Sequence, residues 1–191
     1  MTHRPRITIP SLTMLDSLLS RYAAPRLAPV GGRLSASVST WVLTLAAFAT
    51  GAVALPMIGY RKYMVALGLL VLRALLDVLA GAVARAAQGP ARIGGMLDRV
   101  LDLVLSAAVP FAFALAMPDR ALPAMFLMLG LVARAGVPPE TREPVLVGKT
   151  ELFVAFALAC IFPDRFSVIA YVTGVLCFIS AGQQVARVAS S

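Results

Sequence analysis

Two uncharged stretches of this 191-residue chain are long enough to cross a lipid bilayer as helices, and they constrain its fold more than any other feature. They are Trp41–Tyr60, with 20 residues, and Phe166–Ala186, with 21. About 20 apolar residues in a helix span the hydrocarbon core. The composition agrees, because only 14% of the residues are charged, whereas a soluble domain carries about 25%. We therefore expect an integral membrane protein.

Four further apolar segments lie between these two stretches, separated by short polar connections. Together they predict an all-α protein with six transmembrane helices. The expected helices are Trp41–Tyr60, Tyr63 to about Ala84, about Leu97 to Met117, Ala121–Val137, Leu146–Phe162 and Phe166–Ala186. The chain then divides into a cytoplasmic or interfacial segment, residues 1–36, and a membrane domain, residues 37–188.

The N-terminal segment contains apolar residues at helical spacing. Leu12, Leu15, Leu19 and Tyr22 recur on one face, opposite polar residues. This pattern predicts an amphipathic helix that lies in the membrane interface before the first span. A leader that packs loosely in water fits the pattern equally well.

The distribution of basic residues predicts the orientation in the membrane. With the N-terminus in the cytoplasm, 12 Lys and Arg residues lie on the cytoplasmic side and 4 on the opposite side, while Arg73 lies within a span. Cytoplasmic loops carry an excess of Lys and Arg. We therefore expect a multi-pass protein of the inner or plasma membrane with both termini in the cytoplasm, and we attribute the net charge of +8 to these loops rather than to nucleic-acid binding.

Several kinds of catalytic site are disfavoured by the residues present. The single histidine, His3, argues against a Ser-His-Asp triad and against imidazole-bound zinc. Cys160 and Cys177 lie in apolar runs without metal-ligand spacing, so we expect two packed thiols and no disulfide.

Four acidic residues lie within or at the edge of the predicted spans: Asp77, Asp98, Asp102 and Glu151. An ionised group near the bilayer centre costs on the order of 3 kcal/mol, so such residues normally face a cavity or a partner. They are the main indication of function in this sequence.

The spacing of three of these acids places them together in the cytoplasmic half of the membrane. Asp77 shares one helix face with Gly81 and Arg85, and Asp98 lies one turn from Asp102 on the next helix. Carboxylates one turn apart repel each other, and a divalent cation between the helices would relieve this repulsion. Oxygen ligands favour Mg²⁺ or Mn²⁺ over zinc. A metal beside Arg85 suits a substrate that carries phosphate.

Each of these residues also has a simpler explanation. Asp77 lies four residues after Arg73 and would pair with it, Asp98 would be a boundary charge, and Gly81 would allow close helix packing. Lys149 would extend from a span end to the interface. The four acids would also suit a proton or ion relay in a small transporter, although no internal repeat of the transporter kind is present.

The residues from Asp77 to Asp102 resemble the pattern of the CDP-alcohol phosphatidyltransferase family. That pattern is Asp-x-x-Asp-Gly-x-x-Ala-Arg, then eight residues, then Gly-x-x-x-Asp-x-x-x-Asp. Seven of its eight fixed positions are matched, by Asp77, Gly81, Ala84, Arg85, Gly94, Asp98 and Asp102. The predicted helices and their orientation resemble the family over nearly the whole chain.

The resemblance implies transfer of a phosphatidyl or related phospho-group from a CDP-linked lipid or alcohol to an acceptor alcohol, with release of CMP, in phospholipid biosynthesis. It implies that Asp77, Asp98 and Asp102 bind Mg²⁺ or Mn²⁺, and that Asp102 is the general base for the acceptor hydroxyl. The residues implied for binding the cytidine diphosphate part are Gly81, Ala84, Arg85 and Gly94. It also implies a homodimer.

One departure from the pattern bears on activity. The resemblance implies two metal positions. Ala80 stands where the family has its second aspartate, and a methyl group cannot bind metal, so one of these two expected positions is weakened or lost. Arg73 would compete with metal for Asp77. The alternative to an active enzyme is therefore an impaired family member with a regulatory or partner role.

Two cytoplasmic basic residues, Arg134 and Lys149, are candidates for binding a phosphate on the acceptor. Their simpler explanation is the excess of positive charge expected in cytoplasmic loops.

Overall fold

The computed structural model describes the backbone of residues 40–86, 92–136 and 148–189, and the side chains of 41–83, 100–136 and 148–186. The described backbone forms six α-helices and two short 3₁₀ turns, with no strand among these residues. The helices are α2 (Thr40–Gly59), α3 (Tyr63–Ala86), α4 (Arg92–Ala116), α5 (Ala121–Ala135), α6 (Lys149–Ile161) and α7 (Phe166–Ala189). The predicted all-α class is confirmed. The predicted interfacial helix lies outside the described residues.

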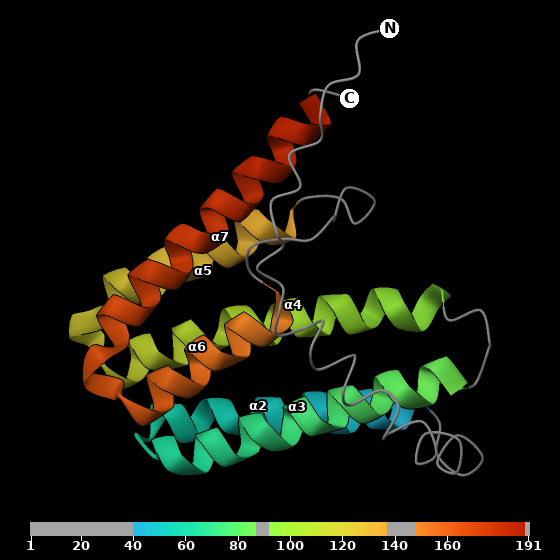
Figure 1. Cartoon of the computed structure of the whole chain (residues 1–191). Coiled ribbons are helices and arrows are strands. Elements are labelled where there is room, and N and C mark those ends of the chain that lie inside the picture. Colours follow the sequence, from blue (N-terminus) through green and yellow to red (C-terminus); the bar gives the residue numbers. More distant parts are fainter. Residues whose placement is uncertain (1–39, 87–91, 137–147, 190–191) are drawn as a thin grey trace, which may run out of the picture.

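The helices form three antiparallel hairpins whose turns lie at the same end of the bundle (Figure 1). The α2–α3 turn contains Arg61 at a φ of 60°. The other two turns are the 3₁₀ segments η1 (Pro118–Arg120) and η3 (Pro163–Arg165), which have the same sequence, Pro-Asp-Arg. Proline suits the first position of such a turn because its fixed φ is helical and its missing N–H would have no partner there. The turns thus follow from residues visible in the sequence.

Arg120 connects two of these turns. Its guanidinium donates a hydrogen bond to the carbonyl of Pro163 and lies 3.9 Å from the carboxylate of Asp164. Arg61 Nε donates to the carbonyl of Ala116 at 3.0 Å, which joins the α2–α3 turn to the end of α4. The turn end of the bundle is therefore held by side-chain to backbone hydrogen bonds between hairpins.

Two helix starts differ from the predicted bounds by more than one residue. α4 begins at Arg92 rather than near Leu97, so Gly94 lies within it as well as Asp98. α6 begins at Lys149 rather than at Leu146. At the start of α6, the Gly148 N–H donates to Glu151 Oε2 at 2.7 Å. A glutamate in this position satisfies a backbone donor that the helix leaves free. Glu151, which the sequence marks as a charge at a span edge, therefore caps its own helix.

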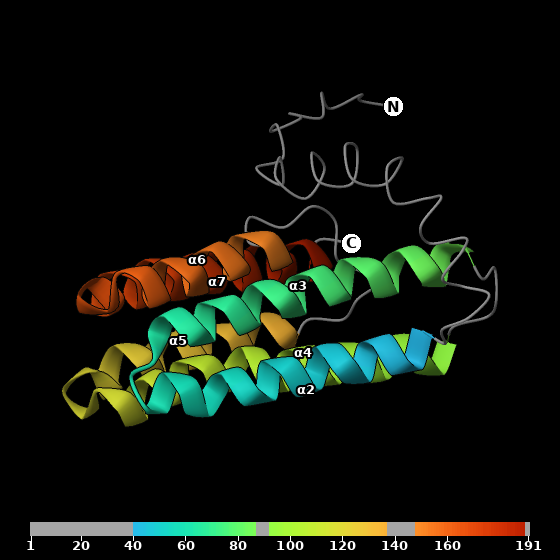
Figure 2. The same cartoon turned by 90° about the horizontal axis from the view of Figure 1, so that it is seen from below.

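The core of the bundle is apolar and closely packed. α2 packs against both α3 and α4, and α5 packs against α4 and α7; Figure 2 shows α3 between α2 and α6. Phe113 stacks on Phe166 with ring centroids 4.5 Å apart. Cys160 and Cys177 are free and buried, which confirms the prediction of packed thiols.

The outer surface of the bundle carries many large apolar side chains, such as Leu115 and Leu122. Three helical stretches are long and apolar enough to cross a membrane: Trp41–Gly59, Tyr63–Val83 and Pro163–Ala186. α4 contributes a shorter apolar segment, Val100–Ala116. Exposed apolar surface of this extent is typical of helices that face lipid.

Candidate active site

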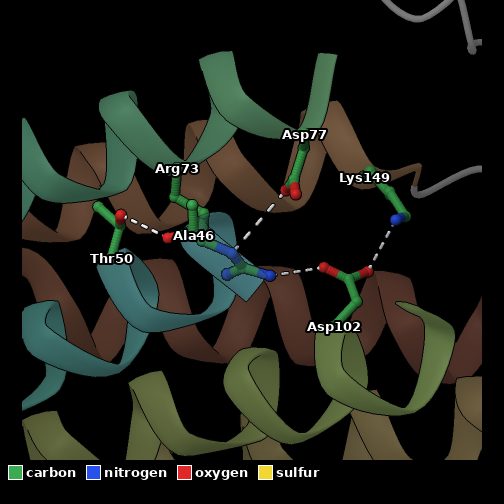
Figure 3. Close-up of polar contacts among 6 residues, drawn as sticks. All are labelled: Ala46, Thr50, Arg73, Asp77, Asp102 and Lys149. Carbon is green, nitrogen blue, oxygen red and sulfur yellow. Dashed lines mark hydrogen bonds and ion pairs between the residues drawn. The ribbon is translucent and has the colours of Figure 1, made fainter. Parts of the chain in front are cut away.

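The centre of the site is the guanidinium of Arg73, which lies between two carboxylates from different helices (Figure 3). Arg73 Nη2 is 2.6 Å from Oδ1 of Asp102 on α4, and Nε is 3.8 Å from Oδ2 of Asp77, one turn along α3. The Arg73 side chain is only 12% exposed. A buried arginine requires such partners, because an unpaired charge in an apolar interior is costly.

Arg73 reaches Asp102 because α2 leaves space for its stem. α2 packs against both α3 and α4, and Gly51 faces the Arg73 side chain. A Cβ at Gly51 would lie 2.8 Å from Arg73 Cδ and 2.9 Å from Leu105 Cδ1, closer than van der Waals contact allows. The absence of a side chain at Gly51 therefore opens the path along which Arg73 joins α3 to α4.

The second oxygen of Asp102 faces another cation. Lys149, the first residue of α6, places Nζ 3.2 Å from Asp102 Oδ2. The Lys149 side chain is 61% exposed, whereas that of Asp102 is 26% exposed. Asp102 thus connects three helices, with a nearly buried arginine at one oxygen and an accessible lysine at the other.

A small cavity of about 10 Å³ adjoins these charges. Its lining residues are Thr44, Phe48, Arg73, Asp77, Leu101, Asp102 and Leu105. A volume of this size is roughly what one water molecule needs. Arg73, Asp77 and Asp102 form the charged part of its lining, and the remaining lining residues come from α2 and α4.

The structure brings together two of the three carboxylates that the sequence predicts to converge, Asp77 and Asp102. The ion pair between Arg73 and Asp77, which the sequence also allows, is present but long at 3.8 Å. The shorter pair between Arg73 and Asp102 was not predicted, because it depends on how two helices pack and leaves no mark in local spacing.

The remaining predicted residues lie at the same end of the bundle, away from the hairpin turns. Ala84 and Arg85 belong to the last turns of α3, and Gly94 and Asp98 to the first turns of α4. Of these four, only the backbone is described. Gly81 follows Ala80, which is buried, on α3. Arg134 is half-buried in the last turn of α5, on a different helix from those that hold Asp77, Asp102 and Lys149.

The donor set tests whether these residues suit a divalent ion. Within the described side chains, no three His, Cys, Asp or Glu residues gather as metal ligands; Asp98 is not among these side chains. Asp77 and Asp102 offer only oxygen atoms, the donors that Mg²⁺ and Mn²⁺ prefer. The chemistry of Asp77 and Asp102 therefore fits a hard divalent ion, and Ala80 adds no donor to them.

Comparison with known proteins assigns the chain to a family. Residues 36–179 match the CDP-alcohol phosphatidyltransferase family. The chain belongs to this family. The resemblance seen from Asp77 to Asp102 is thereby confirmed at the level of the family.

Two similar proteins extend this finding. The inner membrane protein YnjF of Escherichia coli strain K12 is 30% identical over 189 residues, which cover 85% of this chain and 91% of that protein. The crystal structure of phosphatidylinositol phosphate synthase from Mycobacterium tuberculosis with CDP-DAG bound superposes with a TM-score of 0.71 at 19% identity, over 83% of this chain and 90% of that one. The present chain therefore shares the helical fold of a solved structure. Its apolar helices and its similarity to the inner membrane protein YnjF support a membrane location.

Proposed function

We propose that the chain is an active phosphotransferase, which moves a phosphatidyl or related phospho-group from a CDP-linked donor, such as CDP-diacylglycerol, to an acceptor alcohol and releases CMP in phospholipid biosynthesis. The observation that carries this proposal is the approach of Asp77 and Asp102, from consecutive helices, within the pattern of the family. In this proposal the six helices lie in the inner or plasma membrane of the cell with both termini in the cytoplasm, and the chain forms a homodimer.

The three family carboxylates would hold one Mg²⁺ or Mn²⁺ ion, with Asp77 on α3 and both Asp98 and Asp102 on α4. When bound, the ion would neutralise donor phosphate charge and help to orient the phosphorus that is attacked. Gly81, Ala84, Arg85 and Gly94 would bind the cytidine diphosphate part, as the family pattern implies. Arg85 would contribute a permanent positive charge to that binding.

Asp102 would take the proton of the acceptor hydroxyl. The hydroxyl oxygen then forms a bond to the donor phosphorus while the phosphoanhydride bond breaks, and CMP leaves with the bonding electrons. A general base must lie within hydrogen-bond distance of the proton that it accepts. Asp102 is 26% exposed, so an acceptor can approach its carboxylate.

Lys149 would help to bind an acceptor that carries phosphate. It is the accessible cation beside Asp102, with Nζ 3.2 Å from Oδ2. A phosphate bound by Lys149 would therefore bring the acceptor close to the proposed base. Arg134, in the last turn of α5, would contribute a second positive charge on the same side of the membrane.

Two observations favour the alternative, a family member with impaired catalysis and a regulatory role. Both the replacement at Ala80 and the 2.6 Å contact between Arg73 and Asp102 reduce the number of oxygen atoms that are free to bind metal. This alternative predicts a folded protein that binds a CDP-linked lipid without turnover.

The test is a CMP-release assay on the purified chain in lipid nanodiscs. CDP-diacylglycerol is offered with a panel of acceptor alcohols, both with and without a phosphate group, in the presence and absence of Mn²⁺. We expect CMP release that requires Mn²⁺ or Mg²⁺ and one class of acceptor. Binding of CDP-diacylglycerol without CMP release from any acceptor would instead indicate the impaired member. Substrate-dependent flux in proteoliposomes without CMP release would indicate a transporter.

A further inference from the structure

We propose that the guanidinium of Arg73 takes the place of a second divalent ion, so that each chain binds one divalent ion and carries its other cation as a side chain. This inference rests on the proposed function for its set of metal-binding carboxylates. It adds that the guanidinium of Arg73 is a permanent cation of the site, so that only one position remains for a metal ion.

The first argument is the position of the charge. Arg73 directs two different nitrogens at two carboxylates, Nη2 at Asp102 and Nε at Asp77. A planar guanidinium suits this arrangement, because its donors point in fixed directions and it stays charged at any physiological pH. Arg73 thus connects carboxylates of α3 and α4 that would otherwise need a bound cation between them.

The second argument is the balance of charge. Ala80 removes one negative charge relative to the family pattern, and Arg73 brings one positive charge to Asp77 and Asp102. The three carboxylates Asp77, Asp98 and Asp102 and the guanidinium together carry a net charge of −2, which one divalent ion balances. Charges within the depth of a bilayer require compensation, and this balance needs one ion rather than two.

The third argument is the space that the fold reserves for Arg73. Gly51 on α2 has no side chain where a Cβ would lie 2.8 Å from Arg73 Cδ. The cavity that remains beside Arg73 and the two carboxylates is about 10 Å³. The guanidinium of Arg73 thus occupies the position directly between Asp77 and Asp102.

The experiment counts bound Mn²⁺ by electron paramagnetic resonance, which detects the free ion, on protein in phosphatidylcholine nanodiscs without substrate. We expect one Mn²⁺ per chain for the natural sequence. We also expect one for Ala80→Asp, because Arg73 still occupies the second position. The double variant Arg73→Met with Ala80→Asp should bind two. Its matched control, Arg73→Met with Ala80→Asn, should bind one, because the amide adds similar volume without charge.

A second measurement does not require a carboxylate at the buried position 80. In Arg73→Met alone, the single Mn²⁺ should bind about tenfold more tightly, because a neighbouring positive charge no longer repels it or competes for its oxygen ligands. Arg73→Lys keeps the charge and should retain an affinity close to that of the natural sequence. If the variants at position 80 fail to elute as folded protein, these two affinities decide the question.

The proposal is overturned if the natural chain binds two Mn²⁺ ions or none, if Ala80→Asp alone binds two, or if Arg73→Met binds Mn²⁺ no more tightly. A folded double variant that binds one ion would also overturn it. These outcomes do not depend on whether the proposed enzymatic function is correct. One Mn²⁺ without CMP release supports this inference and rejects the enzyme, whereas CMP release with two Mn²⁺ does the reverse.

Discussion

The ammonium nitrogen of Lys149 lies 3.2 Å from Oδ2 of Asp102, and this contact joins the first residue of α6 to the middle of the candidate site. The lysine side chain is 61% exposed. Ion pairs so exposed add little to stability, because water screens them. Its position at the accessible side of Asp102 instead suits the binding of a charged group from solution.

Replacing Lys149 with methionine should weaken the binding of a phosphorylated acceptor. We expect the KM for such an acceptor to rise about tenfold, since one charge-assisted contact is lost, with a smaller change in kcat. The measurement is CMP release at varied acceptor concentration. Lys62→Met is the matched control, because Lys62 is also exposed but lies in the α2–α3 turn at the other end of the bundle. An equal rise in KM for both variants would contradict a role for Lys149 in the site.

Replacing Asp102 with asparagine should reduce CMP release by about 10²–10⁴-fold, which is the usual contribution of a general base. The amide keeps the shape of the side chain but accepts protons poorly. Asp164→Asn is the control, because that carboxylate is 96% exposed in the α6–α7 turn. If Asp102→Asn kept more than half of the natural rate, Asp102 would not be the base.

Gly51→Ala should displace Arg73 without changing any charge. The new Cβ would approach Arg73 Cδ to 2.8 Å and Leu105 Cδ1 to 2.9 Å, and overpacking of this kind typically costs about 1–3 kcal/mol. We expect a lower unfolding temperature in detergent and altered Mn²⁺ affinity. Gly68→Ala provides the comparison, because nothing lies within 4 Å of its Cβ position; it should be neutral or stabilising by up to about 1 kcal/mol. Equal stability of the two variants would show that Gly51 does not make room for Arg73.

Gly130→Ala should destabilise the packing of α5 against α7. A Cβ there would lie 2.9 Å from the carbonyl oxygen of Gly174 and 3.2 Å from Cys177 Cβ. Backbone cannot move aside as a flexible side chain can, so we expect a loss of about 1–3 kcal/mol in the free energy of unfolding. Gly182→Ala on α7, with nothing within 4 Å, is the control. Thermal unfolding of both variants in the same detergent compares them directly.

Much of the fold is predictable because the membrane imposes it. The long apolar runs gave helices near the expected bounds, and the Pro-Asp-Arg turns follow the proline breaks at Pro118 and Pro163. The predicted start of α4, near Leu97, is too late because Arg92, Gly94 and Gly95 interrupt the apolar pattern before it. Helical hydrogen bonding continues past the apolar segment, since a helix can extend beyond hydrocarbon into water.

The candidate site is only partly predictable. Spacing along one helix suggested a pair between Arg73 and Asp77, because residues four apart share a face. The shorter contact of Arg73 with Asp102 depends on the packing of α2 against both α3 and α4 and on the missing side chain of Gly51. Lys149 likewise reaches Asp102 because the first residue of α6 lies beside α4 at this level. Contacts of this kind are set by helix placement, which the periodicity of the sequence does not contain.

The space left by Gly51 has a consequence for the history of this site. If Arg73 replaces an ion, a relative with an acidic residue at the position of Ala80 would not need the arginine at position 73, and a side chain at position 51 would then have only Leu105 to displace. These three positions should therefore co-vary as a set across homologues, with the glycine and the arginine gained or lost together as the number of bound ions changes.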